Sequence, residues 1–409
     1  SLNWGPDGWL YGCQGFATRS TVGKPADGGK LFKKGEPFPE KLPVVDGQYL
    51  DGGVWRYHPT KDRFEIVAHG FSNPWGLDFD DHGQMFITAC VIPHLWHVIP
   101  GGIYHRQGGK HINPAIYDDI KTIADHSHRS AHGGARIYLA DEFPREYRDR
   151  IFMANIHEHA VLTDTLVPKG SGFVGQHGDD TLLANDAAWV GFSIEIGPDG
   201  AVYVLDWHDG DICGNSLTEK ETGRIFRLAP KGLAGKSGLN LAAQSDLELV
   251  ALLTHRNDWY GRRARVILQQ RAAEGRLSAA VPARLWDLFA QAETAAQKLR
   301  ALWALHVTQN LPADRLLPLL DHPEPYIRGW AVQLLGEDHS VGPAASKKFS
   351  ALAVSDPSPV VRLYLASALQ RLPLADRWPI AAGLLAHAED TADHNLPKLI
   401  WSGVESLVP

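Results

Sequence analysis

The stretch "GFSIEIGPDGAVYVLDW" (191–207) decides the fold of the first half of the chain. Apolar and polar residues alternate on both sides of a Gly-Pro-Asp-Gly turn, which predicts a β-hairpin with one buried face. The same arrangement recurs at "LNWGPDGWLYG" (2–12) and "WGLDFDDHGQMFITA" (75–89), and a looser copy with a longer turn occupies 135–156. Repeated hairpins with long connections are typical of a β-propeller, here with about four blades. A stacked sandwich is the alternative, but it would not predict the same turn in each unit.

The first copy of the hairpin stands at the very start of the sequence. Ser1 directly precedes it, so the outer part of its blade has no counterpart in the sequence. We therefore expect a partial propeller of the six-bladed type, with its first blade or blades missing. We expect the chain to be an internal fragment of a longer protein.

From Asp246 onward the pattern changes to a helical period. "RLLPLLDHPEPYIRGWAVQLLG" (315–336) and "FSALAVSDPSPVVRLYLASALQRL" (349–372) share one template, a helix, a Pro-containing turn and a second helix that begins with an Arg. The repeated Arg residues, Arg328 and Arg362, are 34 residues apart. Two-helix units near this length are typical of a HEAT-like α-solenoid. The sequence thus predicts three parts, a β-propeller over 1–230, a linker over 231–245 and HEAT-like helical repeats over 246–409.

Charge and composition exclude some functions. Residues 1–230 hold 21 Lys and Arg against 30 Asp and Glu, which argues against a nucleic-acid partner. No stretch approaches the roughly 18 apolar residues of a membrane span. The P-loop, GxGxxG, GxSxG and HExxH motifs are all absent, which argues against nucleotide-dependent and serine- or zinc-hydrolase chemistry.

Four longer motifs carry a resemblance to a known family. They are "WGPDGWLYGCQG" (4–15), "GVWRYHPTKDRFEIVAHGFSNPWGLDFDDHGQMFITACVIPHLWH" (53–97), "KGSGFVGQHGDD" (169–180) and "VYVLDWHDGDICG" (202–214). Together they resemble bacterial proteins described as membrane-bound dehydrogenases, which have a sorbosone/glucose-dehydrogenase-like propeller, then HEAT repeats and a haem-binding CxxCH domain. The resemblance implies a sugar or polyol oxidoreductase in the periplasm or cell envelope that passes electrons to a haem domain outside this sequence. It implies pyrroloquinoline quinone and calcium as cofactors.

The resemblance also implies positions for the cofactor. An Arg-Asn-Pro motif of the quinoprotein relatives is matched in part by Ser72-Asn73-Pro74-Trp75, where Asn73 is kept and Ser72 replaces the Arg. Trp75, and Arg224 and Arg227 of "GRIFRL", are the other expected cofactor-binding residues. The catalytic His of those relatives would lie upstream of Ser1.

Histidines are concentrated in one part of the chain, because ten of the 20 lie between His94 and His177. Two His-x-His pairs, His126 with His128 and His157 with His159, would each present two imidazoles to one metal ion if they lay on a strand. The alternative is surface histidines or core histidines bonded to backbone carbonyls. "HGG" (132–134) directly precedes a predicted strand, so His132 is a candidate base for a sugar hydroxyl.

The loop "DWHDGDI" (206–212) holds three carboxylates, Asp206, Asp209 and Asp211, which suit calcium. An acidic turn that caps backbone N–H groups is the alternative. The acidic segment "HGDD" (177–180) has a similar composition and is a weaker candidate for a calcium site. Trp75, Trp96, Trp189 and Trp207 lie near predicted blade turns, where they would stack on sugar rings or pack in the core.

A second class of function stays open. The chain would then be a non-catalytic, metal-stabilised propeller and HEAT module that binds a polysaccharide or a protein, with the HEAT surface as the docking face for a protein partner. Ser72 in place of the cofactor Arg favours this alternative. A calcium-dependent lactonase or lyase is a third option, on fold analogy alone.

Overall fold

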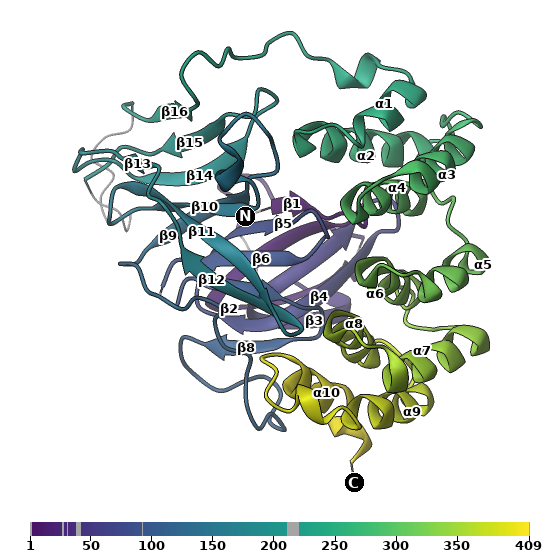
Figure 1. The fold of residues 1–409 in the computed structure, drawn as a ribbon. Coiled ribbons are helices and arrows are strands. Elements are labelled where there is room, and N and C mark those ends of the chain that lie inside the picture. Colours follow the sequence, from purple (N-terminus) through teal and green to yellow (C-terminus); the bar gives the residue numbers. More distant parts are fainter. Residues whose placement is uncertain are drawn as a thin grey trace.

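A computed structural model describes residues 2–26, 28–30, 32–37, 42–91, 93–210 and 221–408. The first region is built from β-sheets and the second from helices that lie along one side of the sheets (Figure 1). The last described strand ends at Leu228 and the first α-helix begins at Asp246. The change from a strand pattern to a helical pattern in the sequence therefore corresponds to the change in structure.

The β-rich region has sixteen strands within its described residues. They are β1 (Leu2–Trp4), β2 (Leu10–Pro25), β3 (Val44–His58), β4 (Arg63–Phe71), β5 (Pro74–Phe79), β6 (Met85–Ala89), β7 (Leu95–Val98), β8 (Ile103–Arg106), β9 (His132–Ile137), β10 (Arg150–Asn155), β11 (Ala160–Lys169), β12 (Gly172–His177), β13 (Leu182–Leu183), β14 (Gly191–Ile196), β15 (Val202–Asp206) and β16 (Arg224–Leu228).

These strands form four sheets that follow one another along the chain, except that β8, which comes after the second sheet, returns to the first. Their orders are β1-β2-β3-β4-β8, β5-β6-β7, β9-β10-β11-β12 with β13 beside β11, and β14-β15-β16. Each predicted hairpin supplies two neighbouring strands of a different sheet, namely β1 and β2, β5 and β6, β9 and β10, and β14 and β15. The four hairpin predictions are therefore confirmed.

The first strands of the second, third and fourth sheets lie against one another. A Cβ added at Gly76 of β5 would lie 2.6 Å from the Cβ of Ala135 in β9. A Cβ at Gly133 of β9 would lie 2.6 Å from the carbonyl oxygen of Phe192 in β14. Such distances exclude a side chain, so the close approach of these backbones requires glycine. This packing explains the Gly pair that follows His132.

Hydrophobic cores fill the space between consecutive sheets. Trp9, Phe71, Leu77 and Trp96 belong to the core between the first and second sheets. The core between the second and third sheets includes Phe86, Leu95, Ile151 and Leu162, and that between the third and fourth includes Phe152, Val161, Trp189 and Val204. Sheets that pack face to face in chain order are the arrangement of β-propeller blades.

The helical region has ten α-helices within its described residues. They are α1 (Asp246–Leu252), α2 (Asp258–Ala273), α3 (Val281–Gln291), α4 (Ala295–Val307), α5 (Ala313–Leu316), α6 (Pro325–Leu335), α7 (Pro343–Ser355), α8 (Pro359–Leu369), α9 (Leu374–Leu385) and α10 (Leu396–Val404). They stack as successive pairs, in which α2, α4, α6, α8 and α10 face the sheets and the others lie outside (Figure 1).

Buried ion pairs join neighbouring helix pairs at equivalent positions. Arg328 of α6 bonds both carboxylate oxygens of Asp356, and Arg362 of α8 bonds both oxygens of Asp390. The two arginines are 34 residues apart and each reaches a carboxylate 28 residues further on. The repeated Arg of the helical template is thus a linker between units, which favours a solenoid.

The inner helices pack on the turns of the sheets. Trp330 of α6 donates its indole N–H to the carbonyl of His82 at 2.7 Å, and Tyr364 of α8 accepts from Gln84 at 2.7 Å. Arg300 of α4 reaches Asp81 at 2.6 Å. The helical region therefore packs along the sheets, and its inner face is occupied.

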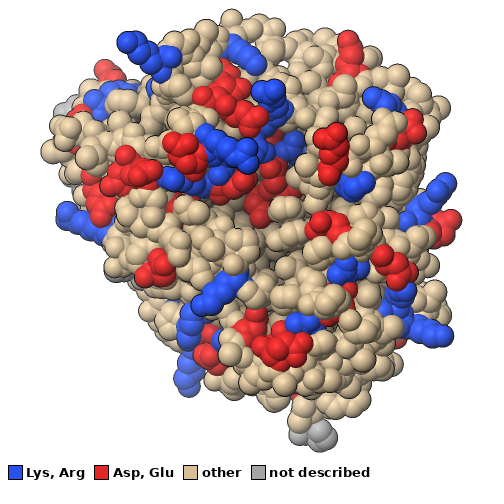
Figure 2. All heavy atoms as spheres, in the orientation of Figure 1, with Lys and Arg blue, Asp and Glu red and all other residues tan. Residues whose placement is uncertain are grey.

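Charges of both signs are interspersed over the face shown in Figure 2, and they gather in the hollow between sheets and helices. Within the described residues, no helix combines the length and the apolar character that crossing a membrane requires.

Candidate metal centre

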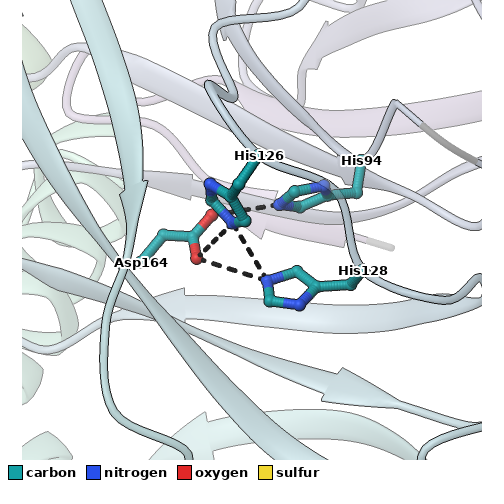
Figure 3. A group of neighbouring side chains, drawn as sticks. All are labelled: His94, His126, His128 and Asp164. Carbon is teal, nitrogen blue, oxygen red and sulfur yellow. Dashed lines mark hydrogen bonds and ion pairs between the residues drawn. The ribbon is translucent and has the colours of Figure 1, made fainter.

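Four side chains from distant parts of the chain meet between the second and third sheets (Figure 3). Asp164 lies in the middle of β11, and His94 lies in the connection between β6 and β7. His126 and His128 come from the segment that precedes β9. One ligand atom from each of the four lies within 4.8 Å of all the others.

The spacing of these atoms fits a single metal ion. Nε2 of His94 lies 3.0 Å from Oδ2 of Asp164, and Nε2 of His126 and of His128 lie 3.2 and 3.6 Å from Oδ1. The Nε2 atoms of His126 and His128 are 3.0 Å apart. A tetrahedral ion with bonds of about 2.0–2.1 Å separates its ligand atoms by about 3.3 Å. These four separations lie close to this value, with His94 facing Oδ2 and His126 and His128 facing Oδ1 of the carboxylate, and one ligand atom from each residue fits within 4.8 Å of the others.

Burial and ionisation also suit metal binding. The side chains of His94 and Asp164 are fully buried, whereas His126 is 19% exposed and His128 9%. Burial alone would raise the pKa of Asp164, but the neighbouring imidazoles of His128, His94 and His126 lower that pKa well below its usual range. Burial lowers the pKa of His94. An ionised carboxylate and a neutral imidazole are the forms that bind metal ions.

A second carboxylate, that of Asp125, lies behind one of the four residues, His126. Nδ1 of His126 lies 3.0 Å from a carboxylate oxygen of Asp125, which directs Nε2 of the same ring toward Asp164. A carboxylate behind a metal-binding histidine is a common arrangement, since it fixes the tautomer and raises the basicity of the ring.

His132, the predicted base, is the first residue of β9 and has no exposed surface. Its ring stacks on that of His94 with centroids 4.5 Å apart. Burial, together with the neighbouring histidines, lowers the pKa of His132 to about 2, so the ring is neutral. A substrate hydroxyl would reach this ring only after neighbouring residues move. His132 therefore supports His94 in this structure.

Of the two predicted histidine pairs, only His126 and His128 belong to the group of four. His157 and His159 lie in the turn between β10 and β11, where Nδ1 of His159 donates to the carbonyl of Trp189 at 2.8 Å. His126 and His128 also lie outside any strand. Neither pair therefore meets the condition of lying on a strand. The first pair converges because both rings turn toward the buried carboxylate of Asp164.

The predicted calcium loop is described only in part. Asp206 is buried, accepts the N–H groups of Val190 and His208 at 2.7 and 2.9 Å, and pairs with Arg224 at 2.6 Å. This is the capping role of the alternative interpretation. Asp209 is also buried, and Asp211 lies outside the described residues.

The expected cofactor arginines are already paired with carboxylates. Arg224 bonds Asp186 and Asp206, and Arg227 bonds Asp199 at 2.7 Å. Neither guanidinium group offers an uncompensated charge to an anionic quinone, so the two residues do not fit that cofactor in this structure.

Asn73 directly precedes β5, and Trp75 is the second residue of that strand. The backbone carbonyl of Asn73 accepts the N–H of Cys90 at 2.8 Å. The ring of Trp75 meets Phe192 edge to face at 4.6 Å, and Phe192 stacks on Trp207 at 4.8 Å. Trp207 is 50% exposed, so it offers a ring face to a ligand. By contrast, Trp96 and Trp189 are core residues, as the alternative interpretation held.

His94 and Asp164 were missed by the sequence analysis. The signal for Asp164 is its position in "AVLTDTLV" (160–167), where a carboxylate interrupts a strand whose neighbours are buried. Charged residues are rarely fully buried without a partner, so such an Asp indicates a functional or paired group.

Two solved structures show what this chain is similar to. One is an oxidoreductase described as a glucose dehydrogenase from Thermus thermophilus, with 22% identity, a TM-score of 0.34, and 55% of this chain and 63% of that chain covered. The other is an aldose sugar dehydrogenase from Streptomyces coelicolor with bound PQQ, with 15% identity, a TM-score of 0.36, and 56% and 60% covered. This chain thus spans less than two-thirds of either structure, and the likeness is too weak to assign a function.

No curated protein matches the chain. The profile of a domain of unknown function, DUF7133, matches residues 1–232. Since this match covers more than half of the sequence and the whole β-rich region, the chain belongs to the DUF7133 family.

Proposed function

We propose that the β-rich region binds one divalent transition-metal ion through His94, His126, His128 and Asp164. The single observation that carries this proposal is the convergence of three imidazole nitrogens on one buried carboxylate. Three nitrogens and one oxygen suit zinc and other first-row divalent ions, whereas calcium prefers an all-oxygen set.

The test compares the two histidine pairs. The protein is stripped with a chelator, loaded with zinc and analysed for metal content after gel filtration. The wild type is expected to retain about one ion per chain, and His128→Ala is expected to lose it. His157→Ala is the matched control, because it removes a histidine of the same sequence pattern outside the group. Equal zinc retention by the wild type and by the double variant His126→Ala/His128→Ala would refute the metal centre.

We propose further that the metal-binding region acts on a sugar or polyol as an oxidoreductase. Support comes from the family resemblance of the four long motifs and from the exposed ring face of Trp207 beside Phe192 and Trp75. Aromatic faces of this kind stack on sugar rings. A haem domain as electron acceptor and a periplasmic or cell-envelope location follow from the resemblance and belong to the same proposal.

The second candidate is a metal-stabilised module that binds a saccharide without turnover. The specific observation in its favour is the pairing of Arg224 and Arg227 with carboxylates, which leaves neither free for a quinone. Dye reduction is measured with a panel of sugars on protein loaded with zinc, or with pyrroloquinoline quinone and calcium. Sugar-dependent reduction supports the oxidoreductase, and saccharide binding without reduction supports the binding module.

A further inference from the structure

A fifth histidine lies at the solvent side of the metal centre. His177 is the last residue of β12, and its side chain is 43% exposed. Its Nδ1 lies 3.8 Å from Oδ1 of Asp164, and its ring centroid lies 4.7 Å from that of His128 and 5.4 Å from that of His126. His177 therefore stands at the edge of the group but outside the set of four.

The other residues of the centre are less exposed than His177, with His126 at 19% and His128 at 9%. His132 covers the ring of His94 and has no exposed surface, and Asp164 is fully buried within β11. Among the histidines of the centre and its surroundings described above, His177 has the greatest exposure. An outside ligand would therefore approach the ion past this residue.

Resting on the proposed metal site, we propose that His177 is an exchangeable ligand. With four ligands in place, Nδ1 of His177 would be a fifth ligand in an expanded coordination shell, and a small oxygen-donor or anionic ligand would take this position when His177 swings out. Neutral imidazole leaves as the new ligand enters, so no proton need be gained or lost by His177.

Of the four histidines around Asp164, His177 lies farthest from its carboxylate, and His94 lies nearest, at 3.0 Å from Oδ2. Oδ1 of Asp164 lies at 3.2 and 3.6 Å from His126 and His128 but at 3.8 Å from His177. On its far side, Nε2 of His177 lies 3.7 Å from Asp180, beyond hydrogen-bond distance, so no short contact fixes its ring there. Zinc sites can expand from four to five ligands, and a weakly held fifth side chain leaves that position available to an outside ligand.

His177 and an outside ligand compete for the same coordination position, so removing His177 should strengthen binding of the outside ligand. If the position is open for about a tenth of the time, His177→Ala raises the apparent affinity of an outside ligand about tenfold. Azide is a suitable probe with cobalt in place of zinc, since cobalt reports its ligands through visible absorption. The measurement is azide titration of cobalt-loaded wild type, His177→Ala and the control variant His157→Ala.

The expected results form one pattern. His177→Ala retains about one cobalt per chain, shows a changed visible spectrum and binds azide about tenfold more tightly than the wild type. Added imidazole restores the wild-type spectrum of His177→Ala and competes with azide. His157→Ala behaves as the wild type.

Failure of this inference is distinguishable from failure of the proposed function. If wild type and His177→Ala bind cobalt equally but share one spectrum and one azide affinity, the exchangeable ligand is refuted and the metal centre stands. If His177→Ala loses the ion, His177 is a permanent ligand and the inference is wrong. If the wild type takes up no ion, the proposed function fails and this inference fails with it.

Discussion

Two segments with the same His-x-His pattern behave differently in this protein. The segment 126–128 precedes β9, and the turn 157–159 joins β10 to β11. Both are therefore next to strands of the third sheet, and neither is part of a strand. Only the first faces a buried carboxylate, Asp164, with a second carboxylate, Asp125, behind it. In the second segment the imidazole of His159 bonds a backbone carbonyl. A histidine pair thus becomes a candidate metal site through the charge that it faces.

The largest effect is expected from removing that charge. Asp164→Asn keeps the shape of the side chain but replaces an anionic ligand by a neutral one. Outer partners of metal ligands contribute about 10–100-fold to affinity, so loss of an inner ligand should cost about 100-fold or more. Zinc affinity measured by competition with a coloured chelator checks this. Asp179→Asn, which changes a carboxylate that pairs with Arg150 outside the group, should stay near the wild type, and equal losses in both variants would contradict the central role of Asp164.

The next effect concerns stability in the presence of zinc. An ion present at 100 times its dissociation constant stabilises the folded state by about 2.7 kcal/mol. This gain should appear in the wild type and in His157→Ala/His159→Ala, but not in His126→Ala/His128→Ala. Urea unfolding of the three proteins with and without zinc is the measurement. A gain that survives in His126→Ala/His128→Ala would place the bound ion elsewhere.

Local patterns of the sequence predicted much of the fold. Hairpins such as 191–207 were predictable because alternation and turn residues act over a few neighbours. The helix pairs were predictable because their template repeats, and Arg328 and Arg362 mark equivalent positions in it. The contact of the inner helices with the sheet turns could not be predicted, since Trp330 and His82 are 248 residues apart.

Two of the four metal-binding residues were predictable, because sequence patterns report only contacts between residues that are close along the chain. His126 and His128 are close in sequence, so their pairing is visible as a motif. His94 and Asp164 are 70 residues apart and meet only when the second and third sheets pack. Nothing in their local sequence reports that contact, although a lone Asp in a buried strand indicates that a partner exists.

A buried histidine in β7, outside the metal centre, makes the stability of the protein depend on pH. His97 lies three residues after His94, is 1% exposed, and its Nε2 is 3.0 Å from Oε1 of Gln84. Burial lowers the pKa of His97 from 6.5 to about 3. Between these values the unfolded state binds a proton that the folded state does not. The contribution of His97 to stability is therefore full above about pH 6.5 and falls by up to about 1.4 kcal/mol per pH unit below it.

His97→Gln removes this titration while keeping a donor for Gln84. The free energy of unfolding, measured without metal at about pH 7 and about pH 5, should fall less on acidification in His97→Gln than in the wild type, by about 2 kcal/mol. His157→Gln is the control, because the side chain it replaces lies in a surface turn. An unchanged pH dependence in His97→Gln would show that His97 is not the titrating group.

The smallest effect tests the backbone of the second segment. His159 has a φ of 51°, in the left-handed region that favours glycine, whereas His126 is not among the residues with positive φ. Both His159→Ala and His159→Gly lose the hydrogen bond to Trp189, which costs about 1 kcal/mol. Only the glycine variant relieves the left-handed strain, so it should be more stable than the alanine variant by about 1 kcal/mol. At position 126 we expect His126→Ala to be more stable than His126→Gly, because glycine there relieves no strain and only adds conformational freedom to the unfolded chain. Urea unfolding of the four metal-free variants checks the two orders. The same order at both positions would mean that the backbone does not distinguish the two segments, and the contrast between them would then rest on Asp164 alone.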